Sequence, residues 1–172
     1  MSTFAIQFAK AAGATVISTT SSKEKAEFLR GMDLPPDYVI DYKSDKNWGE
    51  AARALSAGGL GVDQIVEVGG PATLEQSFNA IKYDGLISII GVLGGAGDAR
   101  PSFAEVLKHN CVMRGVIVGS RSLFEEMNRM IDEKRIKPVI DPKVWDLDEL
   151  KEAYQYLVSR ILFVLDNRTD SV

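Results

Sequence analysis

The chain has 172 residues, of which 45% are apolar and 26% are charged, a composition typical of one soluble globular domain. Its net charge of −4 argues against a nucleic-acid partner, and no apolar run reaches the ~20 residues that a membrane span needs. With one cysteine, Cys111, and one histidine, His109, the chain can form neither an internal disulfide nor a thiolate or imidazole zinc cluster. We therefore expect no zinc site and a reducing, cytoplasmic setting. Lys10 interrupts the first apolar run, so no secretory leader is expected.

Hydrophobic periodicity predicts alternating helices and strands. In the first helix Phe4, Phe8 and Ala12 recur on one face, Ser2 can cap the start, and Gly13 ends it. Short β-branched runs bounded by glycine or proline predict strands. In chain order the predicted elements are helix 2–12, strand 14–18, helix 23–30, strand 38–42, helix 48–55, strand 62–68, helix 72–81, strand 86–92, helix 103–109, strand 112–119, helix 122–134, a short extended piece 138–141 and helix 147–159. This order predicts an α/β fold with a mostly parallel, doubly wound sheet.

The loop after the first predicted strand carries hydroxyls and lysines, with Ser21 and Lys25 among them. Doubly wound sheets bind ligands beyond the carboxyl ends of their strands, and an NAD site has an acidic residue near this position. Serine and lysine can instead hydrogen-bond and neutralise a 2′-phosphate, which favours NADP over NAD. The alternative is that the loop is only a capped helix start with solvated lysines.

Glycines follow the next three predicted strands, at Gly69, Gly91 and Gly119. Three such positions in register are consistent with a ligand that passes close to the backbone. Glycine is also a common strand terminator, so both interpretations remain open at this point.

Several segments together resemble the nucleotide-binding half of zinc-type alcohol dehydrogenases, in the medium-chain dehydrogenase/reductase superfamily. The branch most similar in pattern is the NADP-dependent alcohol dehydrogenases and quinone oxidoreductase-like proteins. The resemblance covers roughly residues 2–158 and depends on the order and spacing of FAIQFAKAAGATVISTTSSKEK, YVIDY, GGLGVDQIVEVGGPATLEQSFNAIKYDGLISIIGVL, MRGVIVGSR and RIKPVIDPKVWDLDELKEAYQYL.

The resemblance implies hydride transfer between NADPH and a small carbonyl compound or alcohol. It implies no catalytic residue in this chain, and it places cofactor contacts at positions that match the family pattern. Ser21 and Lys25 match the 2′-phosphate contacts, and Tyr42 lies near the same phosphate and the adenine. Those nearer the nicotinamide or its ribose are Gly69, Gly91, Val92, Leu93, Gly119 and Ser120. A homodimer joined through the strand edge at 112–118 is also implied.

The departures from the family pattern lead to further expectations. Family members have a strand and a glycine-rich loop before the helix that opens this sequence, and a separate catalytic domain that forms the substrate pocket. We therefore expect a truncated Rossmann-like domain at 1–158, followed by a divergent tail at 159–172. The neighbours of the missing strand would either keep unpaired backbone groups or pair with each other. Two alternatives to an enzyme remain: a non-catalytic fragment that binds nucleotide weakly or pairs with partners through exposed strands, and a chain that does not fold stably.

Overall fold

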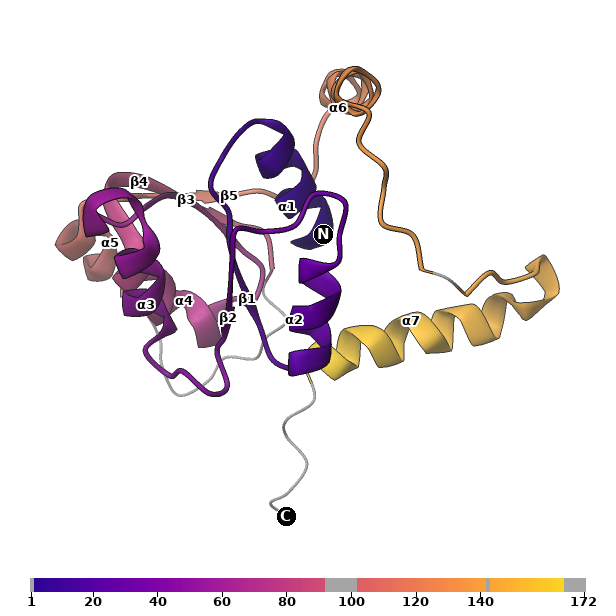
Figure 1. The fold of residues 1–172 in the computed structure, drawn as a ribbon, viewed down its shortest axis with the longest axis horizontal. Coiled ribbons are helices and arrows are strands. Elements are labelled where there is room, and N and C mark those ends of the chain that lie inside the picture. The colour runs from indigo at the N-terminus through magenta and orange to yellow at the C-terminus, as the bar shows by residue number, and fades with distance from the viewer. Residues whose placement is uncertain (1, 92–101, 142, 166–172) are drawn as a thin grey trace, which may run out of the picture.

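The computed structural model describes residues 2–91, 102–141 and 143–165, with side chains to residue 157. Helices and strands alternate, as the sequence predicts (Figure 1). The helices are α1 (Ser2–Ala11), α2 (Lys23–Arg30), α3 (Trp48–Leu55), α4 (Pro71–Ala80), α5 (Phe103–His109), α6 (Arg121–Lys134) and α7 (Leu150–Leu165), with short 3-10 turns η1 (Ala57–Gly59) and η2 (Leu147–Glu149). The strands are β1 (Ile17–Thr20), β2 (Tyr38–Asp41), β3 (Val62–Glu67), β4 (Ile81–Ile89) and β5 (Val112–Gly115). The predicted α/β fold is confirmed.

The strands form two parallel half-sheets instead of one sheet. β1 pairs with β2, and β3, β4 and β5 pair in that order, with every pairing parallel. Within the described residues β1 and β3 do not pair with each other. Of the two arrangements expected for these strands, the structure therefore has the one with unpaired edges.

Helices α3 and α4 bridge the two half-sheets on one face. The cluster of Ile40, Ala52 and Ala80 contacts Ile17 of β1 as well as Ile65 of β3. The helices cross so closely at Gly49 that a Cβ there would lie 2.2 Å from the carbonyl oxygen of Gln76. A second cluster, centred on Phe78, Ile81 and Ile87, packs α4 against β3, β4 and β5.

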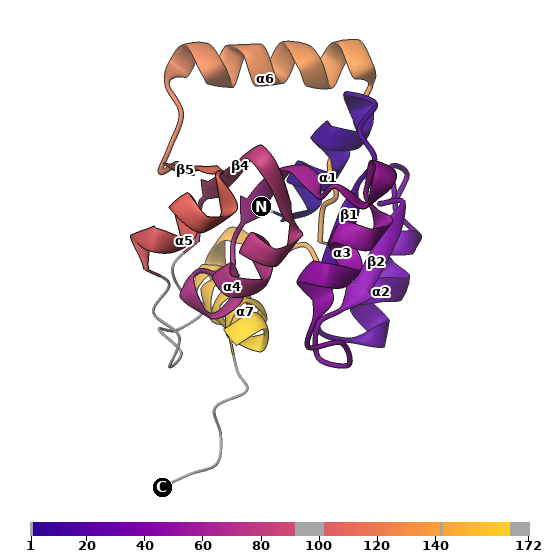
Figure 2. The ribbon, with the colours of Figure 1, turned by 90° about the vertical axis from the view of Figure 1, so that its left-hand side faces the viewer.

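The first helix is held by a segment from the far end of the chain. Ile6 packs with Leu29 and Met32 of the α2 region, and Val139 covers this cluster. Gln7 is buried and donates its side-chain amide to the carbonyl oxygen of Lys137 at 2.6 Å. Residues 138–141, expected to be extended, form no strand here. They are the return segment that follows α6 over α1 (Figure 2).

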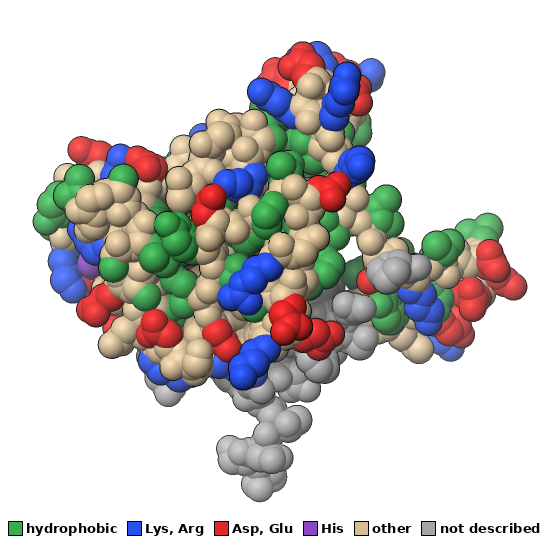
Figure 3. Space-filling model, in the orientation of Figure 1, with side chains coloured by type: hydrophobic (Ala, Val, Ile, Leu, Met, Phe, Trp, Pro, Cys, Tyr) green, Lys and Arg blue, Asp and Glu red, His purple; other side chains and the backbone are tan. Residues whose placement is uncertain are grey.

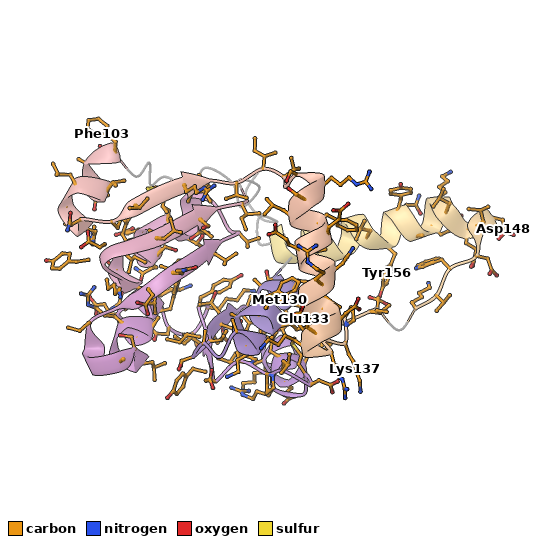
Figure 4. The ribbon with its side chains drawn as sticks, turned by 90° about the horizontal axis from the view of Figure 1, so that it is seen from above. Phe103, Met130, Glu133, Lys137, Asp148 and Tyr156 are labelled. Carbon is orange, nitrogen blue, oxygen red and sulfur yellow. The ribbon has the colours of Figure 1, made fainter. Side chains whose placement is uncertain are left out.

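Described side chains of α7 contact the loop that precedes this helix. Tyr156 donates its hydroxyl to Asp141, and its ring centre lies 5.5 Å from that of Trp145 with the two planes tilted by 58°. The Lys143 ammonium lies 3.6 Å from the centre of the Trp145 ring. Figure 4 shows Tyr156 on the side of α7 that faces this loop, away from the sheets. None of the helices among the described residues is both long and apolar enough to cross a bilayer.

Three predicted strand boundaries were wrong for local reasons. The strand expected at 14–18 begins at Ile17, because a helix-ending turn with Gly13 at φ +84° continues to Ala14. The strand expected at 86–92 begins at Ile81, because the turn at Asp84 shifts the pairing register with β3 but does not end the strand. The strand expected at 112–119 ends at Gly115, where its partner β4 also ends.

Candidate cofactor-binding edge

Ser21, Lys25 and Tyr42 come together at the carboxyl ends of β1 and β2. Thr20 and Asp41 are the last paired residues of these strands, and the Tyr42 N–H donates to the Thr20 carbonyl oxygen at 3.0 Å. Ser21 and Tyr42 therefore lie just beyond the paired ends, next to each other. The Lys25 ammonium donates to the Ser21 hydroxyl at 3.4 Å, and all three residues are half-buried.

The start of α2 positions this group. Ser22 is the N-cap, and its hydroxyl accepts the Lys25 backbone N–H at 3.3 Å. Capping satisfies one of the unpaired amides of the first turn and fixes the direction of the helix. It thereby turns the Lys25 side chain back towards Ser21. The simple interpretation of this loop as a capped helix start is thus correct for Ser22, while Ser21 and Lys25 form a separate cationic, hydroxyl-bearing contact.

A hollow of about 360 Å³ lies nearby, on another side of α2. It is lined by Lys23, Ala26, Glu27, Arg30, Val39, Asp41 and Ser44. Two cationic side chains and two carboxylates line this hollow, so its charges cancel and it does not suit an anionic ligand. It contains none of the three residues predicted to hold a phosphate.

Gly69 belongs to a buried polar network centred on Glu67. The Glu67 carboxylate accepts the backbone N–H groups of Gly69 and Gly70 at 2.8 and 3.0 Å, and also the hydroxyls of Thr73 and Ser77. Gly70 is the N-cap of α4 and has no side chain with which to cap the helix, and the Glu67 carboxylate accepts the N–H groups of the two residues just before the first turn. The amino end of α4 is therefore already occupied by an anion from within the chain.

Gly91 is confined by the backbone of the neighbouring loop. A Cβ at this position would lie 1.8 Å from the Val68 carbonyl oxygen. The Gly91 N–H points to the Glu67 carbonyl oxygen at 3.2 Å, so Gly69 and Gly91 lie around the same residue. Close packing explains the glycine without a ligand. Val92 and Leu93 lie outside the described residues.

Gly119 and Ser120 stand apart from the other predicted positions. Both are exposed at the start of α6, and Ser120 caps that helix by accepting the Leu123 N–H at 3.4 Å. Figure 2 shows α6 as a separate rod above the half-sheets. The structure thus gathers the predicted residues into two groups, Ser21–Lys25–Tyr42 and Gly69–Gly91, and leaves the third pair at the start of α6.

Sequence reasoning did not single out Glu67. The available signal was an acidic residue at the end of an apolar strand, followed by Gly-Gly-Pro and by hydroxyl residues six and ten positions later. The two residues of metal-ligand type have ordinary roles. His109 stacks on Phe78 at 5.3 Å and lies 3.4 Å from Glu105, and burial raises the pKa of the Cys111 thiol.

A comparison with protein families bears on this arrangement. The model of the family described as "Zinc-binding dehydrogenase" matches residues 1–133. The chain belongs to this family. A zinc-type alcohol dehydrogenase-like protein of Schizosaccharomyces pombe is 42% identical over 159 residues, covering 91% of this chain and 45% of that protein. An alcohol dehydrogenase of Geobacillus stearothermophilus is 26% identical, covering 88% of this chain and 42% of its own.

Solved structures of this zinc-binding dehydrogenase family share the fold. A structure described as an NAD-dependent alcohol dehydrogenase is 31% identical and superposes with a TM-score of 0.78 over 92% of this chain. A quinone oxidoreductase of Pseudomonas syringae pv. Tomato DC3000, 22% identical, has a TM-score of 0.73 and shares the fold. This chain spans about half the length, or slightly less, of the proteins it matches.

The family's metal has no ligand set in the described part of this chain. No three His, Cys, Asp or Glu side chains there lie close enough together to hold a metal ion. The Ser21–Lys25 contact, by contrast, suits a phosphate monoester, because a lysine ammonium and a hydroxyl both donate to phosphate oxygens.

Proposed function

We propose that this chain is the cofactor-binding half of an NADP-dependent oxidoreductase of the alcohol dehydrogenase type. When bound, the cofactor supplies a hydride for transfer between NADPH and a small carbonyl compound or alcohol. The role of this chain is to bind and orient the nucleotide, and we assign no catalytic residue to it. Membership in the dehydrogenase family supports the reaction class.

The observation that carries the choice of NADP is the contact between Lys25 and Ser21 at the end of β1. An NAD site uses a carboxylate near this position to accept the ribose hydroxyls. Here residues 19–22 are all hydroxyl-bearing. The next acidic residue along the chain, Glu24, is exposed on α2, and the carboxylate nearest across the sheet is that of Asp41, which pairs with Thr20 on β2. A 2′-phosphate at this place would meet an ammonium, a hydroxyl and the tyrosine that follows β2, Tyr42.

The nicotinamide end of the cofactor is assigned to the glycine-bearing edge. We propose contacts at Gly69 and Gly91, which lie around Glu67, and at Val92, Leu93, Gly119 and Ser120. Support comes from position: Gly69 and Gly91 follow the carboxyl ends of the paired parallel strands β3 and β4, where such sheets bind ligands.

Isothermal titration of the purified chain with NADPH and with NADH tests the proposal. We expect NADPH to bind more tightly, and Lys25→Met to weaken NADPH at least ~10-fold while leaving NADH unchanged, since a hydrogen bond to a charged group contributes about 1.5–3 kcal/mol. Lys23→Met is the matched control, because Lys23 is exposed on another face of α2 and lines the mixed-charge hollow. Equal loss in both variants, or no binding at millimolar NADPH, contradicts the assignment.

We further propose a homodimer through the edge at 112–118. Support comes from the β5 edge and the apolar extension beside it, where Ile117 and Val118 are 93% and 85% exposed. An apolar strand edge of this kind is a ready surface for pairing with a second copy. Sedimentation of the wild type and of Ile117→Asp measures it, and a monomeric wild type contradicts it.

The domain boundaries and setting are proposals as well. We propose a nucleotide-binding unit at 1–158, a divergent tail at 159–172 and a cytoplasmic setting. The similarity to the S. pombe relative, which extends over 159 residues, supports this extent, and the lone thiol of Cys111 suits a reducing compartment.

A second candidate function is that of a non-catalytic module that pairs with partners through its strands. One observation favours it: β1 and β3 have unpaired edges within the described residues. Unpaired edges in the middle of a parallel sheet are unusual, because such sheets are normally buried on both faces and continuous.

A further inference from the structure

Glu67, the last residue of β3, is bonded to both of the chain segments that carry Gly69 and Gly91. Its side-chain oxygen Oε1 accepts the N–H groups of Gly69 and Gly70 at 2.8 and 3.0 Å. Its backbone carbonyl oxygen accepts the N–H groups of Ile90 and Gly91 at 2.9 and 3.2 Å. One residue thus joins the two segments that follow β3 and β4 at the same edge of the sheet.

Two hydroxyl groups of α4 fix the Glu67 carboxylate in this position. The Thr73 hydroxyl donates to Oε1 at 2.6 Å, and the Ser77 hydroxyl donates to Oε2. Glu67 is 4% exposed and Ser77 is 0% exposed, so bulk water does not compete for these bonds. Hydrogen bonds to an ionised acceptor are also stronger than those between neutral groups. The oxygen that binds the glycine turn is therefore itself restrained from the helix side.

The glycine turn depends on this restraint. Gly70 has φ 80° and ψ −148°, a conformation that glycine reaches easily but does not prefer over its many others. Gly69 packs against Thr73, whose hydroxyl oxygen would lie 2.4 Å from an added Cβ. Without the Glu67 carboxylate, the N–H groups of both glycines would lose their acceptor, and two adjacent glycines would be free to take other conformations.

We propose that Glu67 is a positioning residue for the nicotinamide half of the cofactor. It acts through Gly69 and Gly91, whose backbone it fixes beyond the carboxyl ends of β3 and β4, where doubly wound sheets bind ligands. This inference rests on the proposed function. A backbone surface that is already ordered binds more tightly than one that must be ordered on binding, because the ordering lowers the affinity.

The two ends of the proposed cofactor site are separate in the structure. Ser21, Lys25 and Tyr42 lie at the ends of β1 and β2, which do not pair with β3, β4 and β5 in the described part of the chain. The bonds of the Glu67 side chain all go to the turn after β3 and to α4. Loosening Glu67 should therefore affect the nicotinamide end and leave the 2′-phosphate end unchanged.

Two probes measure the two ends by isothermal titration of the purified chain. NADPH engages both ends, whereas 2′,5′-ADP contains the 2′-phosphate half and no nicotinamide. The ratio of the two affinities therefore reports the contribution of the nicotinamide half. A residue that only stabilises the fold would not change this ratio, because it would weaken both probes or neither.

Glu67→Met removes the acceptor and keeps a side chain of similar length. We expect it to lower the ratio at least ~5-fold by weakening NADPH alone, since the turn must then be ordered on binding. Glu67→Gln keeps an amide oxygen that can accept the same two N–H groups, and it is expected to restore most of the ratio.

Two further variants serve as controls for the titrations. Ser77→Ala removes only the bond to Oε2, which binds neither glycine, and should leave the ratio unchanged. Lys25→Met should weaken both probes, because both contain the 2′-phosphate. If Glu67→Met does not fold, Thr73→Val tests the same restraint by removing the hydroxyl bond to Oε1, with an expected fall in the ratio of at least ~2-fold.

The possible outcomes separate this inference from the proposed function. A ratio that falls in Glu67→Met, or in its substitute Thr73→Val, and is unchanged in Ser77→Ala supports the positioning role. An unchanged ratio in the variant tested, or equal weakening of both probes by it, refutes the role and leaves the NADP assignment intact. Wild type that binds 2′,5′-ADP as tightly as NADPH refutes the role together with the nicotinamide contacts. Wild type that binds neither probe refutes the proposed function, and the positioning role with it.

Discussion

Gly91 lies against Val68 so closely that a Cβ on Gly91 would sit 1.8 Å from the Val68 carbonyl oxygen. Gly91→Ala must therefore displace backbone, and we expect it to lower the free energy of unfolding by about 1–3 kcal/mol, as overpacking does. Urea denaturation measures the change. Gly115→Ala is the control, because its Cβ would meet nothing within 4 Å, and it should leave stability unchanged or slightly higher. Equal effects in the two variants would show that the contact with Val68 does not matter.

Removing the Glu67 side chain should lower the free energy of unfolding more than replacing its carboxylate with an amide does. Glu67→Ala leaves the N–H groups of Gly69 and Gly70 without their acceptor, and we expect a loss of about 2–4 kcal/mol. Glu67→Gln keeps one acceptor oxygen, so its loss in the free energy of unfolding should be less than half of the loss in Glu67→Ala. Thermal unfolding compares both with Glu75→Ala, an exposed acidic residue of α4 for which we expect a change within about 0.5 kcal/mol. A Gln variant as unstable as the Ala variant would contradict the importance of the bonds from Gly69 and Gly70.

The ion pair between Lys10 and Asp37 should make the stability of the fold depend on pH in the acidic range. The Lys10 ammonium, followed by the Val16 N–H, holds the pKa of Asp37 below its ordinary value of 3.8. A carboxyl whose pKa is lower in the folded state stabilises the fold above pH 3.8 and loses this contribution as the pH falls through the folded-state pKa. We therefore expect the Tm to fall as the pH drops below 3.8, and Asp37→Asn to flatten this dependence while lowering the Tm at neutral pH.

Asp63 provides the comparison for that measurement. Lys82 lowers the pKa of Asp63 as well. Among the described residues, however, no backbone N–H of another residue is a cause of this shift, as the Val16 N–H is for Asp37. Asp63→Asn should therefore leave most of the acid-induced loss in place. An identical pH dependence in the wild type and Asp37→Asn would contradict the role of Asp37.

Two neighbouring serines should have separable roles at the start of α2. Ser22→Ala removes the N-cap and should lower the free energy of unfolding by about 1 kcal/mol, with little effect on nucleotide affinity. Ser21→Ala removes the hydroxyl that Lys25 contacts, so it should weaken the binding of NADPH with little effect on the free energy of unfolding. Chemical denaturation and titration of both variants measure this contrast, and the reverse pattern would contradict the assignment of Ser21.

The local elements could be predicted from the sequence where periodicity was strong. The helix predicted at 48–55 has the same bounds as α3, and Gly13 ends α1 as predicted. Strand limits were less predictable, because they depend on the partner: β5 ends where β4 ends, which no local pattern encodes. Periodicity also did not predict which apolar residues are exposed. Phe103, for example, is 90% exposed and points away from the sheets (Figure 4).

The candidate site was predictable only in part. Ser21 and Lys25 follow from the rule that ligands bind at strand ends, while Tyr42 was expected only from the family resemblance, and the structure brings the three residues together. The Glu67 network could not be derived from composition or period, since it needs the positions of Thr73 and Ser77 in a folded helix. Charges of both signs are mixed over the face that includes α2 and α6, so no single charged patch points to the site (Figure 3).

The return segment after α6 has a consequence for synthesis of the protein on the ribosome. Gln7 and Lys137 are 130 positions apart, and Ile136, next to Lys137, is 4% exposed. The core around α1 is made well before its covering residues, since Lys137 emerges 130 positions after Gln7. α1 is therefore expected to stay exposed to chaperones and proteases during translation, and a nascent chain stopped at Lys134 should be cleaved in its first helix much faster than one extended past Val139.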